Sequence, residues 1–203
     1  TAERTAAVPW AIIADCVNLF MLSQNEFPSP ALTYFVDNFD KRIQTFQNFR
    51  LISGGTAKRK TAIANDPNGI GITLIDLEAQ YLPRQPIGLS VLPGVFKEFS
   101  IPVLDLEASR DFWLAMGFKP QAGASLSENK MLLSDNLVKI GLYPEVDFRS
   151  TALTYLTDNL SGTNQKLQSV ALETLPIRSG IDGEIVEIRL SSPDGQLFRI
   201  VSE

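Results

Sequence analysis

This sequence of 203 residues contains no histidine and a single cysteine, Cys16. These absences exclude Ser-His-Asp and Cys-His catalysis, zinc and iron sites that use histidine, and an intrachain disulfide. A metal site would have to use carboxylate and carbonyl oxygens, which suit magnesium, calcium or manganese. A lone cysteine also fits a reducing compartment, so we expect a cytoplasmic protein.

Basic clusters and long apolar stretches are also missing. The net charge is −5, and the longest basic run is Lys-Arg-Lys at residues 58–60. Nucleic acid binding needs a clustered basic face, and no apolar run approaches the length that spans a bilayer. We therefore expect neither nucleic acid nor a membrane as a partner.

The chain does contain a repeat. The phrase Ala-Leu-Thr-Tyr-Phe-Val-Asp-Asn at residues 31–38 returns as Ala-Leu-Thr-Tyr-Leu-Thr-Asp-Asn at residues 152–159. A helical stretch follows each copy, and then a Pro-Gly turn, at residues 66–69 and 192–195. Two matches at nearly the same spacing indicate an internal duplication.

Hydrophobic periodicity predicts the elements around this repeat. In the middle of the chain we expect a strand at 96–103, a helix from Asp105 to Gly117, and strands at 130–134 and 137–143. After the second phrase we expect a helix capped by Asp158 or Asn159, then strands at 184–191 and 196–202. In the first half we expect a helix at 39–49 and strands at 10–14, 17–23, 31–36, 61–65 and 70–77.

Residues 99–118, Phe-Ser-Ile-Pro-Val-Leu-Asp-Leu-Glu-Ala-Ser-Arg-Asp-Phe-Trp-Leu-Ala-Met-Gly-Phe, resemble the opening of the vicinal oxygen chelate superfamily. Its members include glyoxalase I, bleomycin-resistance proteins and extradiol dioxygenases. The strand ending in Val-x-Asp and the Asp/Ser-Pro-Asn/Asp-Gly turn carry this resemblance, although Trp113 replaces the usual Tyr and Met116 the usual Leu.

The resemblance implies an α+β fold of tandem glyoxalase-like domains, built from paired βαβββ modules that form curved mixed sheets. It places an N-terminal domain at 1–82, a linker at 83–95 and a C-terminal domain at 96–203. The first module lacks its opening strand and helix. Either the chain begins inside this module or the missing piece precedes residue 1. We favour the second alternative, since a missing strand would leave an open sheet edge.

The resemblance also places four metal ligands in each cup-shaped site. In the C-terminal domain they fall at Glu98, near Gly141, at Ala152 and at Arg199, and in the N-terminal domain two of them fall at Ala31 and Thr73. Of these, Glu98 alone could bind a metal, and a guanidinium would repel one. We therefore expect no metal and no cofactor.

Six side chains are candidates for ligand binding in the C-terminal cup. Glu98 and Arg199 are expected to point inward, either as an ion pair that replaces the metal or with Arg199 left to bind an anion. Strand alternation adds Ser100, Lys139, Tyr143 and Thr154 to the same face. The alternative for all six is an ordinary solvent-facing position.

The leading prediction is a metal-independent protein that binds a small organic molecule in a cup, as the resistance proteins of the family do. A second hypothesis is a lyase, isomerase or dioxygenase that gathers carboxylates such as Glu98, Glu145 or Glu187 around a hard cation, or uses Glu98 for metal-free acid/base work. A third is a structural or interaction protein whose cups are filled by side chains. No catalytic residue is assigned, and a homodimer is left open.

Overall fold

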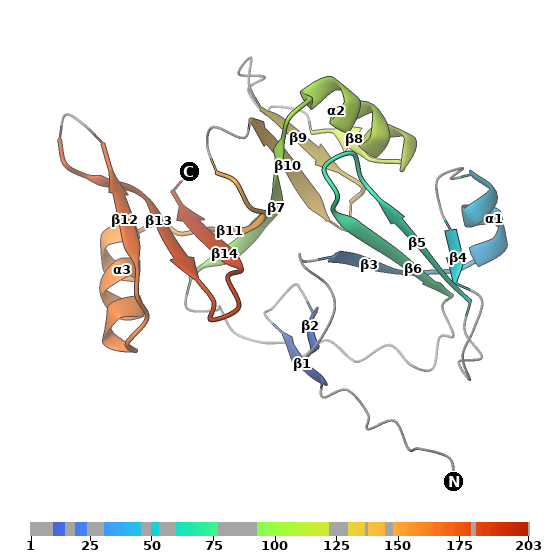
Figure 1. The fold of residues 1–203 in the computed structure, drawn as a ribbon. Coiled ribbons are helices and arrows are strands. Elements are labelled where there is room, and N and C mark those ends of the chain that lie inside the picture. The colour runs from blue at the N-terminus through green and yellow to red at the C-terminus, as the bar shows by residue number, and fades with distance from the viewer. Residues whose placement is uncertain are drawn as a thin grey trace, which may run out of the picture.

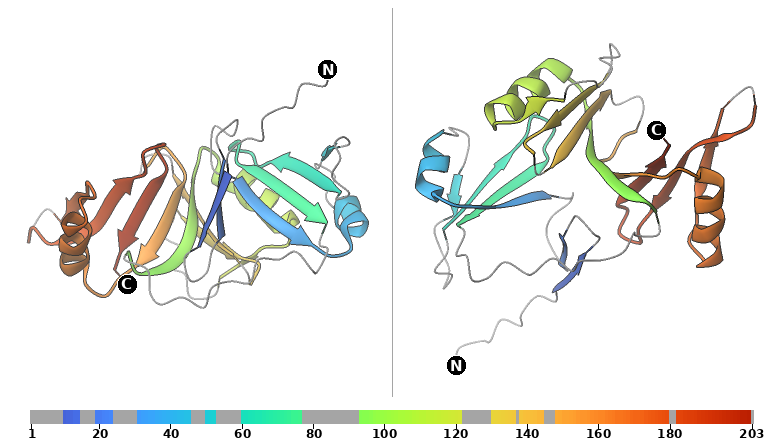
Figure 2. Two further views of the ribbon diagram at one scale, coloured as in Figure 1. Left: turned by 90° about the horizontal axis from the view of Figure 1, so that it is seen from below. Right: turned by 180° about the vertical axis from the view of Figure 1, so that it is seen from behind.

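The computed structural model describes residues 10–14, 19–23, 31–45, 50–52, 60–76, 93–121, 130–136, 138–144, 148–179 and 182–202. Its strands form a sheet of two strands, one of four and one of eight (Figure 1). The molecule is elongated, with helix α1 (Phe39–Thr45) at one end and helix α3 (Leu160–Ser169) at the other (Figure 2). The predicted α+β fold with curved mixed sheets is confirmed.

Three modules share one strand order. The N-terminal module comprises β3 (Ala31–Val36), β6 (Gly71–Asp76), β5 (Thr61–Asn65) and β4 (Arg50–Ile52), in that spatial order. The central module repeats the order with β7 (Val95–Val103), β10 (Lys139–Pro144), β9 (Met131–Ser134) and β8 (Lys119–Pro120). The C-terminal module repeats it with β11 (Ala152–Leu156), β14 (Leu197–Val201), β13 (Ile185–Ser191) and β12 (Leu175–Arg178).

The eight-stranded sheet arises because the central and C-terminal modules join through their first strands. β7 and β11 pair antiparallel, whereas each of them pairs parallel with the last strand of its own module. In the N-terminal module β3 likewise pairs parallel with β6. The two copies of the repeated phrase therefore form equivalent strands, β3 and β11.

Polar side chains fix where the helices of the eight-stranded sheet begin. Helix α2 (Leu106–Ala115) starts at Asp105, whose carboxylate accepts a hydrogen bond from the Ala108 amide at 3.0 Å. Helix α3 starts at Asn159, which accepts from the Gly162 amide at 2.8 Å, so Asn159 rather than Asp158 is the cap. An N-cap oxygen satisfies a backbone donor that the first helical turn leaves unpaired.

The two Pro-Gly turns also have a local cause. Asp66 Oδ1 accepts hydrogen bonds from the amides of Asn68 and Ile70, both at 2.8 Å, and Gly69 takes the left-handed φ of 84°. In the second turn Ser192 Oγ accepts from the Gln196 amide at 3.0 Å, and Gly195 has φ 89°. The short polar side chain closes the turn, and glycine supplies the positive φ at little steric cost.

The main hydrophobic core is shared between two modules. Ile70 and Ile72 of the N-terminal module pack in one cluster with Phe99, Ile101 and Trp113 of the central module. The side-chain Nδ2 of Asn68 also donates to Ser109 Oγ of α2 at 3.0 Å. The C-terminal module has a separate core, formed by Tyr155, Leu160, Leu167, Ile188 and Ile200.

Most predicted elements are confirmed within a residue or two, including the N-terminal pair β1 (Trp10–Ala14) and β2 (Leu19–Ser23). The helix predicted at 39–49 is described only as far as Thr45. The short strands β4, β8 and β12 were not located in the sequence, because their two to four residues carry no readable alternation. The division into 1–82, 83–95 and 96–203 stays a prediction, and most of the expected linker lies outside the described residues. None of the described helices is both long and apolar enough to cross a membrane.

Candidate functional site

The six predicted ligand-binding side chains share one face of the eight-stranded sheet. Thr154 of β11 lies opposite Glu98 of β7 on one side and opposite Arg199 of β14 on the other. Ser100 lies opposite Gly141 of β10, and Lys139 and Tyr143 flank Gly141 at two residues' distance. Paired residues and residues two apart in a strand point the same way. We call this surface the polar face; helices α2 and α3 pack through the cores on the other face.

The Glu98 carboxylate is the centre of a buried hydrogen-bond network. Its Oε1 accepts from the Tyr143 hydroxyl at 2.5 Å and from Ser100 Oγ at 2.9 Å. Ser100 Oγ also lies 2.7 Å from Thr154 Oγ1. Glu98, Ser100 and Thr154 are each at most 1% exposed. Burial, followed by the neighbouring Glu98 carboxylate, raises the pKa of Tyr143 well above its ordinary value, so its hydroxyl stays a donor.

Gly141 leaves the space that this network occupies. A Cβ at this position would lie 2.5 Å from Glu98 Oε1 and 2.5 Å from Tyr143 Cε2. Contacts below 3.0 Å require atoms to move, so a larger residue would displace the carboxylate from its partners. The glycine is therefore needed for close approach, not for an unusual backbone angle.

A second network surrounds Arg199. Its Nε donates to Glu187 Oε1 at 3.0 Å and its Nη2 to Glu187 Oε2 at 2.9 Å, while Arg189 Nε donates to the same Oε1 at 2.5 Å. The guanidinium carbon of Arg199 also lies 5.1 Å from the Tyr143 ring and 4.6 Å from the Phe148 ring, within the range of cation–π contacts. Within the described part of the chain, the buried Arg199 Nη1 has no hydrogen-bond partner.

The charges of this second network hold each other ionised. Burial works against the charged forms of Glu187 and Arg199, but the hydrogen bonds between them outweigh it. As a result the pKa of Glu187 is lowered and that of Arg199 is raised. The guanidinium groups of Arg189 and Arg199 share the single carboxylate of Glu187, so the cluster has a net charge of +1.

The predicted pairing of Glu98 with Arg199 is wrong. Both side chains lie on the expected face, but each ends in a different network, with Thr154 between them in the register. Arg199 takes Glu187 because a carboxylate two positions along the adjacent strand can accept from two of its nitrogens. Lys139 lies on the polar face and is exposed.

The side chains at the four expected ligand positions do not fit a metal ion. Glu98 is the one carboxylate among them, Gly141 has no side chain, Ala152 is fully buried and has no ligand atom in its side chain, and Arg199 is a cation. Among the described residues, no three His, Cys, Asp or Glu side chains lie together in a way that could hold a metal ion. Of the carboxylates that a metal-dependent enzyme would use, Glu187 is held by two arginines and Glu145 lies outside the described residues. At the two positions in the N-terminal module, Ala31 and Thr73 provide no carboxylate either.

The sequence does not single out Arg189 and Phe148, and it suggests a different role for two other residues of this site: Glu187 only as a carboxylate of the metal-dependent alternative, and Gly141 only as a ligand position, not as the source of space for Glu98. A signal for two of them was present. The Ser192–Gly195 turn fixes the hairpin register, which places Arg189 opposite Arg199. Like charges opposite each other are destabilising, so a carboxylate on the same face is required, and Glu187 is two residues away. No sequence signal marks Phe148.

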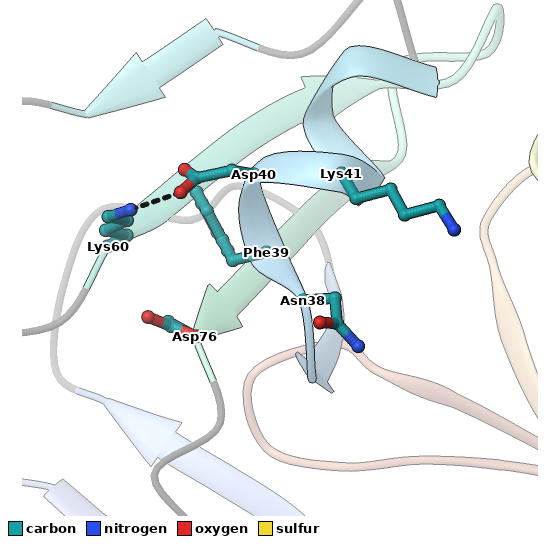
Figure 3. Close-up of a pocket in the computed structure, with 6 residues that line it drawn as sticks. All are labelled: Asn38, Phe39, Asp40, Lys41, Lys60 and Asp76. Atoms are coloured by element: carbon teal, nitrogen blue, oxygen red, sulfur yellow. Dashed lines mark hydrogen bonds and ion pairs between the residues drawn. The ribbon is translucent and has the colours of Figure 1, made fainter.

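A pocket of about 390 Å³ lies away from the polar face, in the N-terminal module. Its lining residues are Asn38, Phe39, Asp40, Lys41, Lys60 and Asp76 (Figure 3). The Lys60 ammonium and the Asp40 carboxylate, both well exposed, form an ion pair of 2.6 Å at its rim. None of the six predicted side chains belongs to this pocket.

No family model matches this sequence, and no curated protein matches it. Solved structures do match. A catechol 2,3-dioxygenase is 12% identical, with a TM-score of 0.56 over 96% of this chain and 79% of that one. The 2,3-dioxygenase LapB from Pseudomonas sp. KL28 is 14% identical, with a TM-score of 0.52 over 84% of this chain and 70% of that one.

The homoprotocatechuate 2,3-dioxygenase from Arthrobacter globiformis is 13% identical, with a TM-score of 0.54. The alignment covers 90% of this chain, which spans 64% of that enzyme. The chain therefore has the vicinal oxygen chelate fold of the extradiol dioxygenases. At this level of identity the likeness concerns the fold and not the chemistry.

Proposed function

We propose that this chain binds a small organic molecule with an anionic group on the polar face of its eight-stranded sheet, without a metal. The observation that carries the proposal is the state of Arg199. Its guanidinium is fixed by Glu187 and by two aromatic rings, and its buried Nη1 has no partner among the described residues.

The polar face supplies what such a ligand requires. A buried donor without a partner is costly, and a ligand oxygen in front of Arg199 Nη1 would remove that cost. The surplus positive charge favours a carboxylate over a neutral acceptor. The rings of Tyr143 and Phe148, 5.2 Å apart, offer apolar contact to the rest of the ligand. The four positions that would carry metal ligands in this fold supply no metal donor set, so binding must use these groups directly.

An NMR titration with benzoate, an aromatic carboxylate, tests the proposal, and benzyl alcohol serves as its neutral counterpart. We expect benzoate to shift the Ser100 and Thr154 amides and the Arg199 Nε–H signal, in protein that has been dialysed against EDTA. Arg199→Met should weaken this binding at least tenfold, since a charged hydrogen bond contributes about 1.5–3 kcal/mol. Arg178→Met is the matched control, because Arg178 is exposed and donates to the backbone carbonyl of Gly183.

Two results would contradict the proposal. One is the absence of benzoate-induced shifts on the polar face, and the other is binding that Arg199→Met leaves unchanged. Shifts that appear only after addition of manganese or iron(II) would likewise exclude metal-independent binding and favour the enzyme hypothesis.

A structural role of the Glu98 network is the second candidate, favoured by its burial. Glu98, Ser100 and Thr154 are linked by hydrogen bonds, and Glu98 and Tyr143 occupy the space beside Gly141. In that case Tyr143→Phe would lower the free energy of unfolding while no small carboxylate bound to the polar face. Binding of benzoate to the polar face of the wild-type protein would show that the role of this face is not purely structural.

A further inference from the structure

The turn between β5 and β6 carries a polar contact from the N-terminal module to the central one. Asn68 stands at its third position, and the Asn68 Nδ2 donates to Asp66 Oδ2 and to Ser109 Oγ of α2, both at 3.0 Å. Asp66 is 4% exposed and Ser109 is fully buried. Figure 1 shows this turn beside α2. A neutral amide that donates twice therefore joins the two modules next to their shared core.

The equivalent turn of the C-terminal module solves the same problem with other residues. There the first position is Ser192 and the third is Asp194, and the serine hydroxyl donates to the Asp194 carboxylate. In both turns the first side chain also accepts from the amide four residues later, that of Ile70 or Gln196. Each turn thus pairs one donor with one acceptor between its first and third side chains. Carboxylates at both positions would leave this pair without a donor.

Asn68 is followed by Gly69, and no other asparagine of the chain precedes a glycine. This dipeptide favours loss of the amide, because glycine has no side chain to hinder its own backbone nitrogen. A bond forms between the Gly69 nitrogen and the Asn68 Cγ, the Cγ–Nδ2 bond breaks, and ammonia leaves with the proton of the Gly69 amide. Water then opens the resulting succinimide ring at one of its two C–N bonds. The products are aspartate or isoaspartate at position 68.

Three hydrogen bonds oppose this reaction in the folded protein. The Gly69 amide donates to the Asp66 carbonyl at 3.0 Å, and the Asn68 Nδ2 makes its two bonds to Asp66 and Ser109. Ring closure requires the Gly69 nitrogen and the Asn68 side chain to leave these acceptors. The reaction therefore proceeds from a locally opened state, in which the turn has come away from α2.

We propose that Asn68 is a deamidation site that makes separation of the N-terminal and central modules irreversible. Deamidation removes the donor to Ser109 and places a second carboxylate against the buried Asp66, so that repulsion replaces a hydrogen bond. Isoaspartate also adds one carbon atom to the backbone of the turn, which displaces Ile70 from the shared core, where it is 5% exposed. Because ammonia is lost, the modules cannot regain their original contact.

The first test measures the rate of deamidation in the full-length chain by peptide mass spectrometry at mildly alkaline pH. Asp194→Asn places an Asn-Gly pair in the second turn and serves as an internal reference. We expect Asn68 to react at least tenfold more slowly than this reference, since its bond to the charged Asp66 must break first. Adding Ser109→Ala should accelerate the reaction of Asn68 about fivefold, the contribution of one neutral hydrogen bond. The reference should keep its rate, which separates local opening from general destabilisation.

The second test examines the consequence of deamidation. Asn68→Asp reproduces one product, and hydrogen exchange in β6 and α2 should become at least tenfold faster, while exchange in β13 stays unchanged. Combining it with Asp66→Ser turns the first turn into a copy of the second, Ser-Pro-Asp-Gly. The double variant should recover most of the protection, because the new hydroxyl can donate to the new carboxylate as Ser192 does to Asp194. Asp66→Ser alone completes the double-mutant cycle.

Four results would overturn the proposal. Two concern the rate: Asn68 that reacts as fast as the amide introduced at position 194, or a rate that Ser109→Ala leaves unchanged. The other two concern the product: Asn68→Asp protein that protects β6 and α2 as well as wild type does, or a double variant that recovers nothing. None of these results depends on whether the polar face binds an anion.

Discussion

Replacement of Gly141 by alanine should destabilise the protein, although backbone conformational preference alone predicts that it would stabilise the strand. In a strand, glycine to alanine normally stabilises by about 0.4–1 kcal/mol, because the unfolded chain loses freedom. Here the new Cβ would lie 2.5 Å from Glu98 Oε1 and 2.8 Å from Glu98 Cδ. The Glu98 carboxylate must therefore move, although it is 1% exposed and accepts from Tyr143 and Ser100.

The magnitude follows from what the carboxylate loses. Loss of one hydrogen bond to a charged group costs about 1.5–3 kcal/mol, and overpacking adds about 1–3 kcal/mol of strain. After the gain in propensity is subtracted, about 2–5 kcal/mol of destabilisation remains for Gly141→Ala. In a chain of this size that lowers Tm by about 5–20 °C. Thermal and urea unfolding measure it directly.

Gly71→Ala is the matched control, because Gly71 also lies within a strand and has an ordinary φ. Its new Cβ would come no closer than 3.2 Å to the Ala31 Cβ and would have no carboxylate atom within 4 Å, so we expect a change within about 1 kcal/mol. In a Tyr143→Phe background, Gly141→Ala should cost less, since Glu98 then has one bond fewer to lose. The reasoning fails if Gly141→Ala unfolds at the wild-type temperature, or if its cost matches that of Gly71→Ala.

Three further predictions concern ionisation and metal. Burial opposes the charge of Glu187, but its two guanidinium partners leave its pKa below 4.5, so its stabilising contribution is present above pH 4.5 and is lost as pH falls through the folded pKa. Unfolding free energies of wild type and Glu187→Gln should therefore converge in acid, and a constant difference down to pH 3 would contradict this account. Burial and then the Glu98 charge raise the pKa of Tyr143 above 10.0, so its contribution is present below pH 10 and is lost at higher pH; wild type and Tyr143→Phe should converge in alkali. Elemental analysis after incubation with manganese, magnesium, zinc or iron(II) should find no stoichiometric metal, and one tightly bound ion per chain would refute metal-independent binding.

The placement of the polar face was predictable because strand alternation and the Pro-Gly turns are local signals. Ser100, Thr154 and Tyr143 point where alternation places them. The choice of ionic partners was not predictable in the same way, since it depends on which residues of neighbouring strands come within hydrogen-bonding distance. Glu98 joins Tyr143, 45 residues away, and Arg199 joins Glu187.

The strands that the sequence did not predict also depend on neighbouring strands, in this case through backbone hydrogen bonds. β8 consists of Lys119 and Pro120, and β12 contains Pro176, which sequence rules count against a strand. Both form because an adjacent strand, β9 or β13, offers unpaired backbone groups. Their existence follows from the neighbour rather than from their own residues.

The core shared by the N-terminal and central modules affects the order in which the protein can fold during synthesis. Ile70 and Ile72 leave the ribosome before Phe99 and Trp113, against which they pack. At the usual rates of translation, the apolar side chains of β6 therefore lack their packing partners for several seconds, until α2 has been synthesised. Nascent chains whose residues 99–115 are still inside the ribosome and chains in which these residues have emerged should therefore differ sharply in protease resistance across residues 61–76, since the later segment completes the burial of the earlier one.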